Sequence, residues 1–247
     1  SIIQFKMEGQ AVKRNPHFNM DDRLVFDNID FKSGTTMIDG KKHKLKDTGF
    51  PTVNPKSPYE LSAEEKEVMD KLRSSFMNSQ LLQQHIDFLF TRGSMYLTHN
   101  SNLLYHGCIP MDENGDFEKF EIEGKTYSGK QLCDHFDRVA RKGYFQRNSK
   151  GDDGNSLDYM WYLWCGPLSP LFGKKKMATF ERYYIADKDT HKEGRNPYYT
   201  LAFNEEKYCD KILSEFDLDP STSHIVNGHV PVKVKKGESP IKANGKL

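Results

Sequence analysis

An α/β fold is predicted for this 247-residue chain by a change in its hydrophobic pattern. Apolar residues recur at helical spacing through 62–92, and from 94 onward they also form short runs with strand character. With 36% hydrophobic residues, the chain can bury one large core or two smaller ones. We expect a mostly helical part over 1–92 and an α/β part over 93–247.

The first part is expected to contain helices, one hairpin and one loop. Asn15-Pro16 ends the first helix, because the residue before a proline is disfavoured in the helical conformation. Asp39-Gly40 is a typical two-residue hairpin turn. Ser62 and Glu65 have the spacing of a capping box, which begins a helix. The predicted helices are 1–13, 62–78 and 79–92, the hairpin is 35–45, and the proline-rich loop is 50–60.

The second part is expected to combine short strands with helices. Glu123-Gly124 predicts another hairpin turn, and the aromatic segment 157–167 is expected to lie in the core. A short buried strand is expected just before His229. The predicted strands are 94–99, 102–107 and 224–228, the hairpin is 118–129, the helices are 129–143 and 203–216, and a polar loop is 146–156.

Charge and composition give no sign of a nucleic-acid or membrane partner. The chain has 36 Lys+Arg and 35 Asp+Glu, a formal net charge of +1, so any recognition of phosphate must be local. No apolar run approaches the roughly 20 residues that span a bilayer. The cysteines show no C-x-x-C spacing and are expected to be reduced thiols in a cytoplasmic protein. They are Cys108, Cys133, Cys165 and Cys209.

Both ends of the sequence are expected to be cut from a longer protein. Helical spacing begins at Ser1 without a polar lead-in. Near the other end, Asn244-Gly245 predicts a hairpin whose returning strand has only Lys246 and Leu247.

Two histidines share a setting that suits a metal ligand. His106 ends one predicted strand and His229 follows another, and each is next to a glycine. In α/β proteins, ligands collect at the carboxyl ends of strands. Although 123 positions apart, the two imidazoles are therefore expected to converge, with ring nitrogens within about 4–6 Å when no metal is bound. The alternative is that both are hydrogen-bonded structural histidines.

Two basic stretches provide candidate phosphate ligands. The first follows a glycine-containing turn at 172–173, and the second follows His229 directly. A phosphate dianion needs cationic donors of this kind, whereas the alternative is a solvated surface. The candidates are Lys174, Lys175, Lys176, Arg182 and Lys233.

Several segments resemble the class III fructose-1,6-bisphosphatases of bacteria, and the resemblance extends over essentially all 247 residues. They are RSSFMNSQLLQQHIDFLF (73–90), NLLYHGCIPMDENGDF (102–117), YLWCGPLSPLFGKKKMATFERYY (162–184) and HIVNGHVPVKVKKGESPIKANGKL (224–247). The resemblance implies a metallophosphatase-type β-sandwich flanked by helices, with a largely helical insertion over 1–92. It also implies hydrolysis of the 1-phosphate of fructose 1,6-bisphosphate to give fructose 6-phosphate in gluconeogenesis.

The same resemblance implies two divalent metal ions, with manganese expected, and His106 and His229 as ligands of one of them. The metallophosphatase superfamily takes its remaining metal ligands from three other motifs, and none of them occurs in this sequence. These motifs are Gly-Asp-x-His, Gly-Asp-x-x-Asp-Arg-Gly and Gly-Asn-His-Asp/Glu. No catalytic residue is therefore assigned in this chain, and the isolated chain is expected to be inactive. Two alternatives stay open: a non-catalytic interaction module, and a phosphatase acting on another sugar phosphate or a phosphoprotein. A homo-oligomeric state also stays open.

Overall fold

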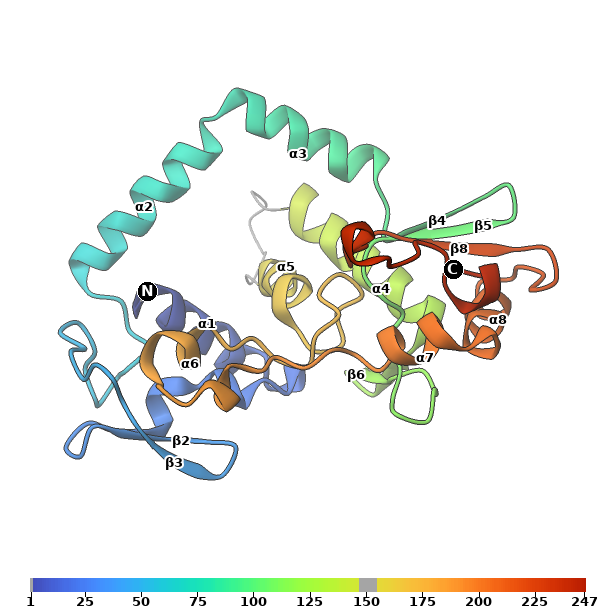
Figure 1. The fold of residues 1–247 in the computed structure, drawn as a ribbon. Coiled ribbons are helices and arrows are strands. Elements are labelled where there is room, and N and C mark those ends of the chain that lie inside the picture. The colour runs from blue at the N-terminus through green and yellow to red at the C-terminus, as the bar shows by residue number, and fades with distance from the viewer. Residues whose placement is uncertain (1, 147–154) are drawn as a thin grey trace. The chain divides into compact units, whose positions relative to one another are not determined.

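The computed structural model describes residues 2–146 and 155–247 (Figure 1). The predicted polar loop at 146–156 lies almost wholly outside these residues. The chain divides into two compact units: unit 1 comprises Ser1–Arg92 and Met177–Glu193, and unit 2 comprises Gly93–Lys176 and Gly194–Leu247. The expected domain division after 92 stays a prediction, because contacts do not show which parts fold independently.

Unit 1 combines helices with one small antiparallel sheet of order β1-β2-β3. Its α-helices are α1 (Ile2–Arg14), α2 (Ala63–Met77), α3 (Gln80–Arg92) and α6 (Thr179–Tyr184). Its strands are β1 (Ile29–Asp30), β2 (Thr35–Ile38) and β3 (Lys41–Lys44). Its 3₁₀ helices are η1 (Pro16–Phe18), η2 (Asp21–Arg23), η3 (Val25–Asn28) and η4 (Lys188–His191).

Local sequence signals begin and end these elements as predicted. The Ser62 hydroxyl accepts the Glu65 N–H at 3.2 Å and the Glu65 carboxylate accepts the Ser62 N–H at 2.9 Å, so the capping box at the start of α2 is confirmed. Asp39 and Gly40 have positive φ angles of 49° and 74°, as the predicted hairpin turn between β2 and β3 requires.

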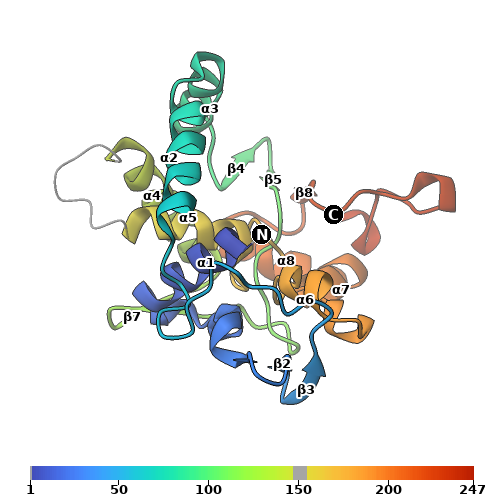
Figure 2. The same cartoon turned by 90° about the vertical axis from the view of Figure 1, so that its left-hand side faces the viewer.

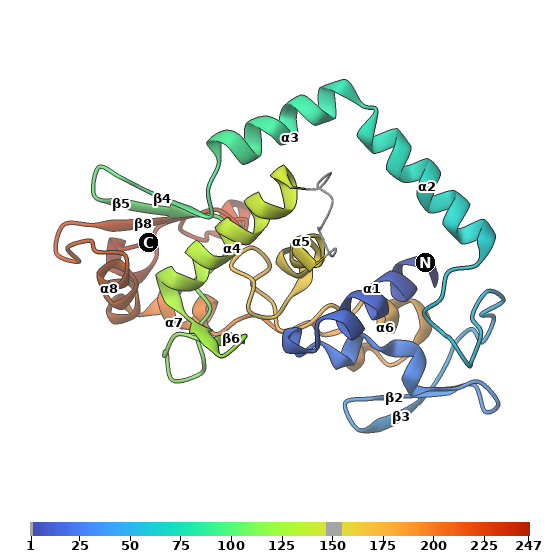
Figure 3. The same cartoon turned by 180° about the vertical axis from the view of Figure 1, so that it is seen from behind.

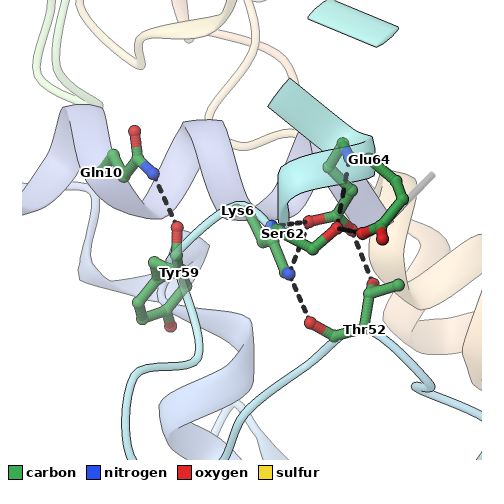
Figure 4. Close-up of polar contacts among 7 residues, drawn as sticks. Lys6, Gln10, Thr52, Tyr59, Ser62 and Glu64 are labelled. Carbon is green, nitrogen blue, oxygen red and sulfur yellow. Dashed lines mark hydrogen bonds and ion pairs between the residues drawn. The ribbon is translucent and has the colours of Figure 1, made fainter. Parts of the chain in front are cut away.

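The core of unit 1 is built from aromatic rings around α1. Phe5 meets Phe180 edge-on, with ring centroids 5.4 Å apart, and Phe26 in the same way at 6.3 Å. Lys6, the next residue of α1, is fully buried and bonds Glu65 at the start of α2 and the Thr52 carbonyl (Figure 4). The buried Lys6–Glu65 bond therefore ties α1 to the beginning of α2. Figure 2 shows the ribbons of these two helices.

Beyond Glu65, no described side chain of α2 or α3 is buried within this chain. The apolar face predicted for α2 is real, but Phe76 at its far end is 60% exposed, and Phe88 on α3 is 68% exposed. Apolar residues at helical spacing thus line a surface that nothing in the described structure covers.

The described residues of unit 2 form a three-stranded sheet of order β4-β5-β8, a β6-β7 hairpin and four α-helices. The strands are β4 (Tyr96–His99), β5 (Asn102–Tyr105), β6 (Phe120–Ile122), β7 (Lys125–Tyr127) and β8 (His224–Asn227). The helices are α4 (Gly129–Phe145), α5 (Asn155–Cys165), α7 (Tyr198–Asn204) and α8 (Glu206–Glu215), with 3₁₀ helices η5 (Val234–Lys236) and η6 (Ala243–Gly245).

The sheet of unit 2 combines two strands that are consecutive in sequence, β4 and β5, with β8 from near the end of the chain. β4 and β5 pair antiparallel around Asn100-Ser101, so both predicted strands belong to one sheet. β5 pairs in parallel with β8, with Leu103 opposite Ile225 and both side chains in the core. Helices α4 and α5 pack side by side (Figure 3), where Phe136 stacks on Tyr162.

Two of the predicted core segments are more exposed than expected. The aromatic segment forms α5, and its helical turn directs Trp164 outward with 75% of its surface exposed. The strand expected to be buried is β8, where only Ile225 of the four residues is buried, because β8 is the last strand of its sheet. Both predictions were therefore only partly correct.

Two boundaries were predicted wrongly. The helix expected over 203–216 is α8, but it begins only at Glu206, because Glu205 has extended dihedral angles and separates it from the end of α7. The expected hairpin at Asn244-Gly245 is the 3₁₀ helix η6, although Lys242 and Leu247 still exchange backbone hydrogen bonds across it. Local sequence propensity did not indicate the helix break at Glu205 or the 3₁₀ helix at the chain end.

The fold class is therefore confirmed as mixed α/β with small sheets, while the metallophosphatase sandwich remains a proposal. In the part of the chain described here, no helix combines the length and apolar character needed to cross a membrane.

Candidate functional site

β5 and β8 lie side by side (Figure 1), and their parallel pairing brings His106 and His229 to one edge of the sheet. Tyr105, the last residue of β5, lies opposite Asn227, the last residue of β8. His106 follows the first strand immediately and His229 comes two residues after the second. Because the carboxyl ends of parallel strands meet at the same edge, residues far apart in sequence become neighbours there.

The two imidazoles are in direct contact. His229 Nδ1 lies 3.0 Å from His106 Nε2, and the rings are nearly perpendicular at 86° with centroids 4.9 Å apart. The predicted convergence is confirmed, at a shorter distance than expected. One ring nitrogen donates and the other accepts, so His106 and His229 form a hydrogen-bonded pair in this structure. Their role as metal ligands stays a prediction.

Neighbouring polar groups fix the backbone that carries His106. The Asn227 side-chain amide donates to the carbonyls of His106, at 2.9 Å, and Gly107, at 2.5 Å. The Tyr199 hydroxyl donates to the Gly107 carbonyl at 3.0 Å, and its ring centroid lies 6.2 Å from that of His229. Asn227 and Tyr199 thus hold the chain where it leaves β5.

The glycine after His106 is required by a close backbone approach. A Cβ on Gly107 would lie 2.0 Å from the Pro170 carbonyl oxygen, which accepts the Cys108 N–H at 2.9 Å. At Gly228, beside the other histidine, a Cβ would meet nothing within 4 Å.

Gly107→Ala is therefore expected to lower the free energy of unfolding by about 1–3 kcal/mol, because the new methyl group overpacks a backbone contact. Gly228→Ala is the matched control and should stay within about 0.5 kcal/mol of the parent protein. Urea unfolding of both variants measures the difference. Equal stability of the two variants would contradict the assignment of Gly107 to this contact.

The electrostatic surroundings favour a neutral His229. Burial lowers the pKa of this imidazole, and the nearby His106, Lys174 and Arg195 lower it further. A neutral imidazole has a free lone pair, which is the form that binds a metal ion.

The five candidate phosphate ligands differ in their location and in their partners. Lys174 lies opposite Arg195 in an antiparallel bridge and acts on His229. Lys175 is paired with Glu113 at 2.7 Å. Arg182 belongs to unit 1, where it is paired with Glu193 at 2.9 Å. The remaining two, Lys176 and Lys233, are half-buried and exposed respectively.

The donor set fits part of a metal centre. Two imidazole nitrogens, from residues 123 positions apart, lie 3.0 Å apart and are of the type that first-row metal ions bind. Among residues 2–146 and 155–247, however, no group of three or more His, Cys, Asp or Glu side chains is arranged to hold a metal. His106 and His229 can therefore contribute two ligands, and the others must come from elsewhere.

Sequence comparison matches this chain to one family along its whole length. The model described as Firmicute fructose-1,6-bisphosphatase matches residues 1–247. The chain belongs to the Firmicute fructose-1,6-bisphosphatase family. No solved structure matches the chain.

Relatives named fructose-1,6-bisphosphatase class 3 support the same assignment. The chain is 57% identical to the one from Alkaliphilus metalliredigens (strain QYMF) and 54% identical to the one from Clostridium tetani (strain Massachusetts / E88). It is 56% identical to the one from Clostridium novyi (strain NT). Each match covers 100% of this chain but 37% of the relative, as expected for a sequence that is part of a longer protein.

In this bisphosphatase-family chain, sequence reasoning missed three residues of the site. Asn227 and Tyr199 fix the histidine backbone, and Arg195 acts on His229. Asn227 could have been found from the sequence, because it ends the predicted strand directly before Gly228-His229. Arg195 and Tyr199 could not have been found in this way, because both are far in sequence from the two histidines. Arg195 lies just before α7, and Tyr199 lies in its first turn.

Proposed function

We propose that the full-length protein is a fructose-1,6-bisphosphatase that releases the 1-phosphate of fructose 1,6-bisphosphate and yields fructose 6-phosphate in gluconeogenesis. The observation that carries this proposal is the His106–His229 contact at the sheet edge of a chain from the Firmicute fructose-1,6-bisphosphatase family. The relatives' shared name supports the substrate. We place the protein in the cytoplasm, which four free and buried cysteines support.

His106 Nε2 and His229 Nδ1 would hold one of two divalent ions, with manganese as the proposed metal. When bound, such ions polarise phosphoryl oxygens and lower the pKa of a bound water. The chain's own contribution is to present two imidazoles, one of them on a backbone fixed by Asn227 and Tyr199. The remaining metal ligands and the metallophosphatase sandwich are proposed to come from the part of the full-length protein outside this chain.

Of the five proposed phosphate-binding residues, Lys174 has the strongest structural support, because its charge acts on His229. Lys174→Ala in the full-length enzyme is expected to raise the KM for fructose 1,6-bisphosphate about tenfold, since it removes one charged hydrogen bond. Lys175→Ala should raise it less, because Glu113 engages that ammonium group. A larger effect at Lys175 than at Lys174 would contradict this order. Lys176, Arg182 and Lys233 remain proposed phosphate ligands.

A substrate panel tests the proposed function. Full-length protein supplied with manganese should hydrolyse fructose 1,6-bisphosphate with a higher kcat/KM than other sugar phosphates or phosphopeptides. A preference for another ester would replace the substrate, and no hydrolysis of any ester would favour the non-catalytic interaction module. The isolated 247-residue chain holds only two imidazole ligands, so we expect it to bind manganese weakly and to hydrolyse the bisphosphate negligibly.

A further inference from the structure

A second cation faces Lys174 beside the histidine pair. Lys174 and Arg195 lie directly opposite each other in an antiparallel bridge, and the neighbouring Asn196 N–H donates to the Gly173 carbonyl at 3.0 Å. Directly opposed residues of an antiparallel pair project from the same face. Lys174 and Arg195 therefore form one cationic pair, contributed by two segments that are separate in sequence.

The Tyr199 side chain lies beside both the Lys174–Arg195 pair and His229. A Cβ on Gly173 would lie 2.4 Å from the Tyr199 hydroxyl oxygen, so the backbone just before Lys174 runs against that side chain. The Tyr199 ring is in turn 6.2 Å from the His229 ring, centroid to centroid. The backbone before Lys174 and the His229 ring therefore both lie beside the Tyr199 side chain.

The guanidinium of Arg195 is available to a ligand. Arg195 is exposed, and across the described residues it makes no ion pair within 4.0 Å and no side-chain hydrogen bond. Two other basic residues of unit 2 are each paired with a carboxylate: Lys175 bonds Glu113 and Lys211 bonds Asp116, each at 2.7 Å. Two like charges close to a proposed metal site repel a cation, and an anion between them removes that repulsion.

The chemistry of a bisphosphate indicates which anion fits. Divalent ions neutralise the oxygens of the phosphate that is hydrolysed. The other phosphate carries a similar charge without a metal partner and needs side-chain cations. A guanidinium matches it, because its planar fork donates two parallel hydrogen bonds to phosphate oxygens.

We propose that Arg195, together with Lys174, binds the phosphate group that is not hydrolysed and so makes the site selective for a sugar bisphosphate. This inference rests on the proposed function. It assigns Arg195 as a residue that determines specificity, with fructose 6-phosphate, the product that keeps this phosphate, as its simplest ligand.

Calorimetric binding to metal-depleted full-length protein tests the inference without turnover. Fructose 6-phosphate carries only the phosphate proposed to bind Arg195, and fructose 1-phosphate carries only the other one. Arg195→Ala is expected to weaken binding of fructose 1,6-bisphosphate and fructose 6-phosphate by about tenfold or more, as the loss of a charged hydrogen bond predicts. Binding of fructose 1-phosphate should change by less than about twofold. Arg195→Lys, which keeps the charge but not the fork, should lie between.

The control is Arg138→Ala, which removes an exposed arginine from α4 in the same unit and should leave all three affinities unchanged. Equal weakening of all three ligands by Arg195→Ala would overturn the inference, because Arg195 would then serve the reacting phosphate or the general structure. Unchanged affinities would also overturn it. If the parent protein hydrolyses the bisphosphate and Arg195→Ala has no selective effect, the inference alone fails; if the parent protein neither binds nor hydrolyses it, the proposed function fails.

Discussion

Replacing His106 or His229 with alanine in the full-length protein is expected to lower both manganese affinity and hydrolysis of fructose 1,6-bisphosphate by about 100-fold or more. The two ring nitrogens lie 3.0 Å apart, and in the proposed site each would bind the same ion. Removing one imidazole leaves the ion a ligand short, and the remaining ring loses its partner. Isothermal titration with manganese and steady-state kinetics measure the two effects separately.

Two histidines of the same sheet serve as matched controls. His99 ends β4 and His224 begins β8, and both are exposed. His99→Ala and His224→Ala remove the same chemical group from the opposite end of this sheet, where both residues flank Asn102, and should change manganese affinity by less than about twofold. If His106→Ala and His229→Ala bind manganese as tightly as these controls, the contact between the rings is only a structural hydrogen bond.

The second large effect is expected at the buried ion pair of unit 1. Glu65→Ala should lower the free energy of unfolding by about 3–5 kcal/mol, because it leaves the ammonium group of Lys6 buried without a counter-charge. Lys6 is completely buried and its Nζ lies 2.7 Å from Glu65 Oε2. The same carboxylate accepts the Thr52 hydroxyl at 2.6 Å and the Ser62 N–H at 2.9 Å, so the substitution also removes the capping box (Figure 4).

Glu67→Ala is the control on the same helix. Glu67 pairs with Lys71 at 2.6 Å, but both side chains are largely exposed, so its loss should cost at most about 0.5 kcal/mol. Urea unfolding of full-length protein, followed by hydrogen exchange in α1 and α2, compares the variants. If Glu65→Ala and Glu67→Ala lower the free energy of unfolding equally, the buried Lys6–Glu65 pair stabilises unit 1 no more than the exposed Glu67–Lys71 pair does.

The Lys6–Glu65 pair also predicts a dependence on pH. Burial alone would raise the pKa of Glu65, but hydrogen bonds from Lys6, Thr52 and Ser62 together lower it below its ordinary value of 4.5. A carboxylate whose pKa is lower in the folded state stabilises the fold fully above the ordinary value. That stabilisation is lost as the pH falls below 4.5. Glu65→Ala should therefore show a weaker loss of stability between neutral and acidic pH than the parent protein.

Elements governed by neighbouring residues could be predicted from the sequence. The capping box at Ser62 and the turn at Asp39-Gly40 depend on hydrogen bonds and dihedral angles within a few residues, so their sequence signals suffice. The convergence of His106 and His229 was also predicted, because two strand ends beside glycines are typical positions for ligands.

Features that depend on distant contacts could not be predicted. No local pattern gives the parallel pairing of Leu103 with Ile225, which sets the distance between the histidines. The exposure of Trp164 depends on which face of α5 meets α4. Arg195 reaches the site through its bridge to Lys174, a contact between segments about twenty residues apart. Each of these is decided by tertiary packing, which outweighs local propensity.

The most direct test of the account is an anomalous difference map, recorded at the manganese absorption edge from crystals of full-length protein grown with manganese. We predict a peak bound by His106 Nε2 and His229 Nδ1 at about 2.0–2.2 Å from each nitrogen. Further ligands should come from residues outside the 247 studied. Manganese peaks located elsewhere, with the two imidazoles still bonded only to each other, would contradict the assignment of this histidine pair to the metal centre.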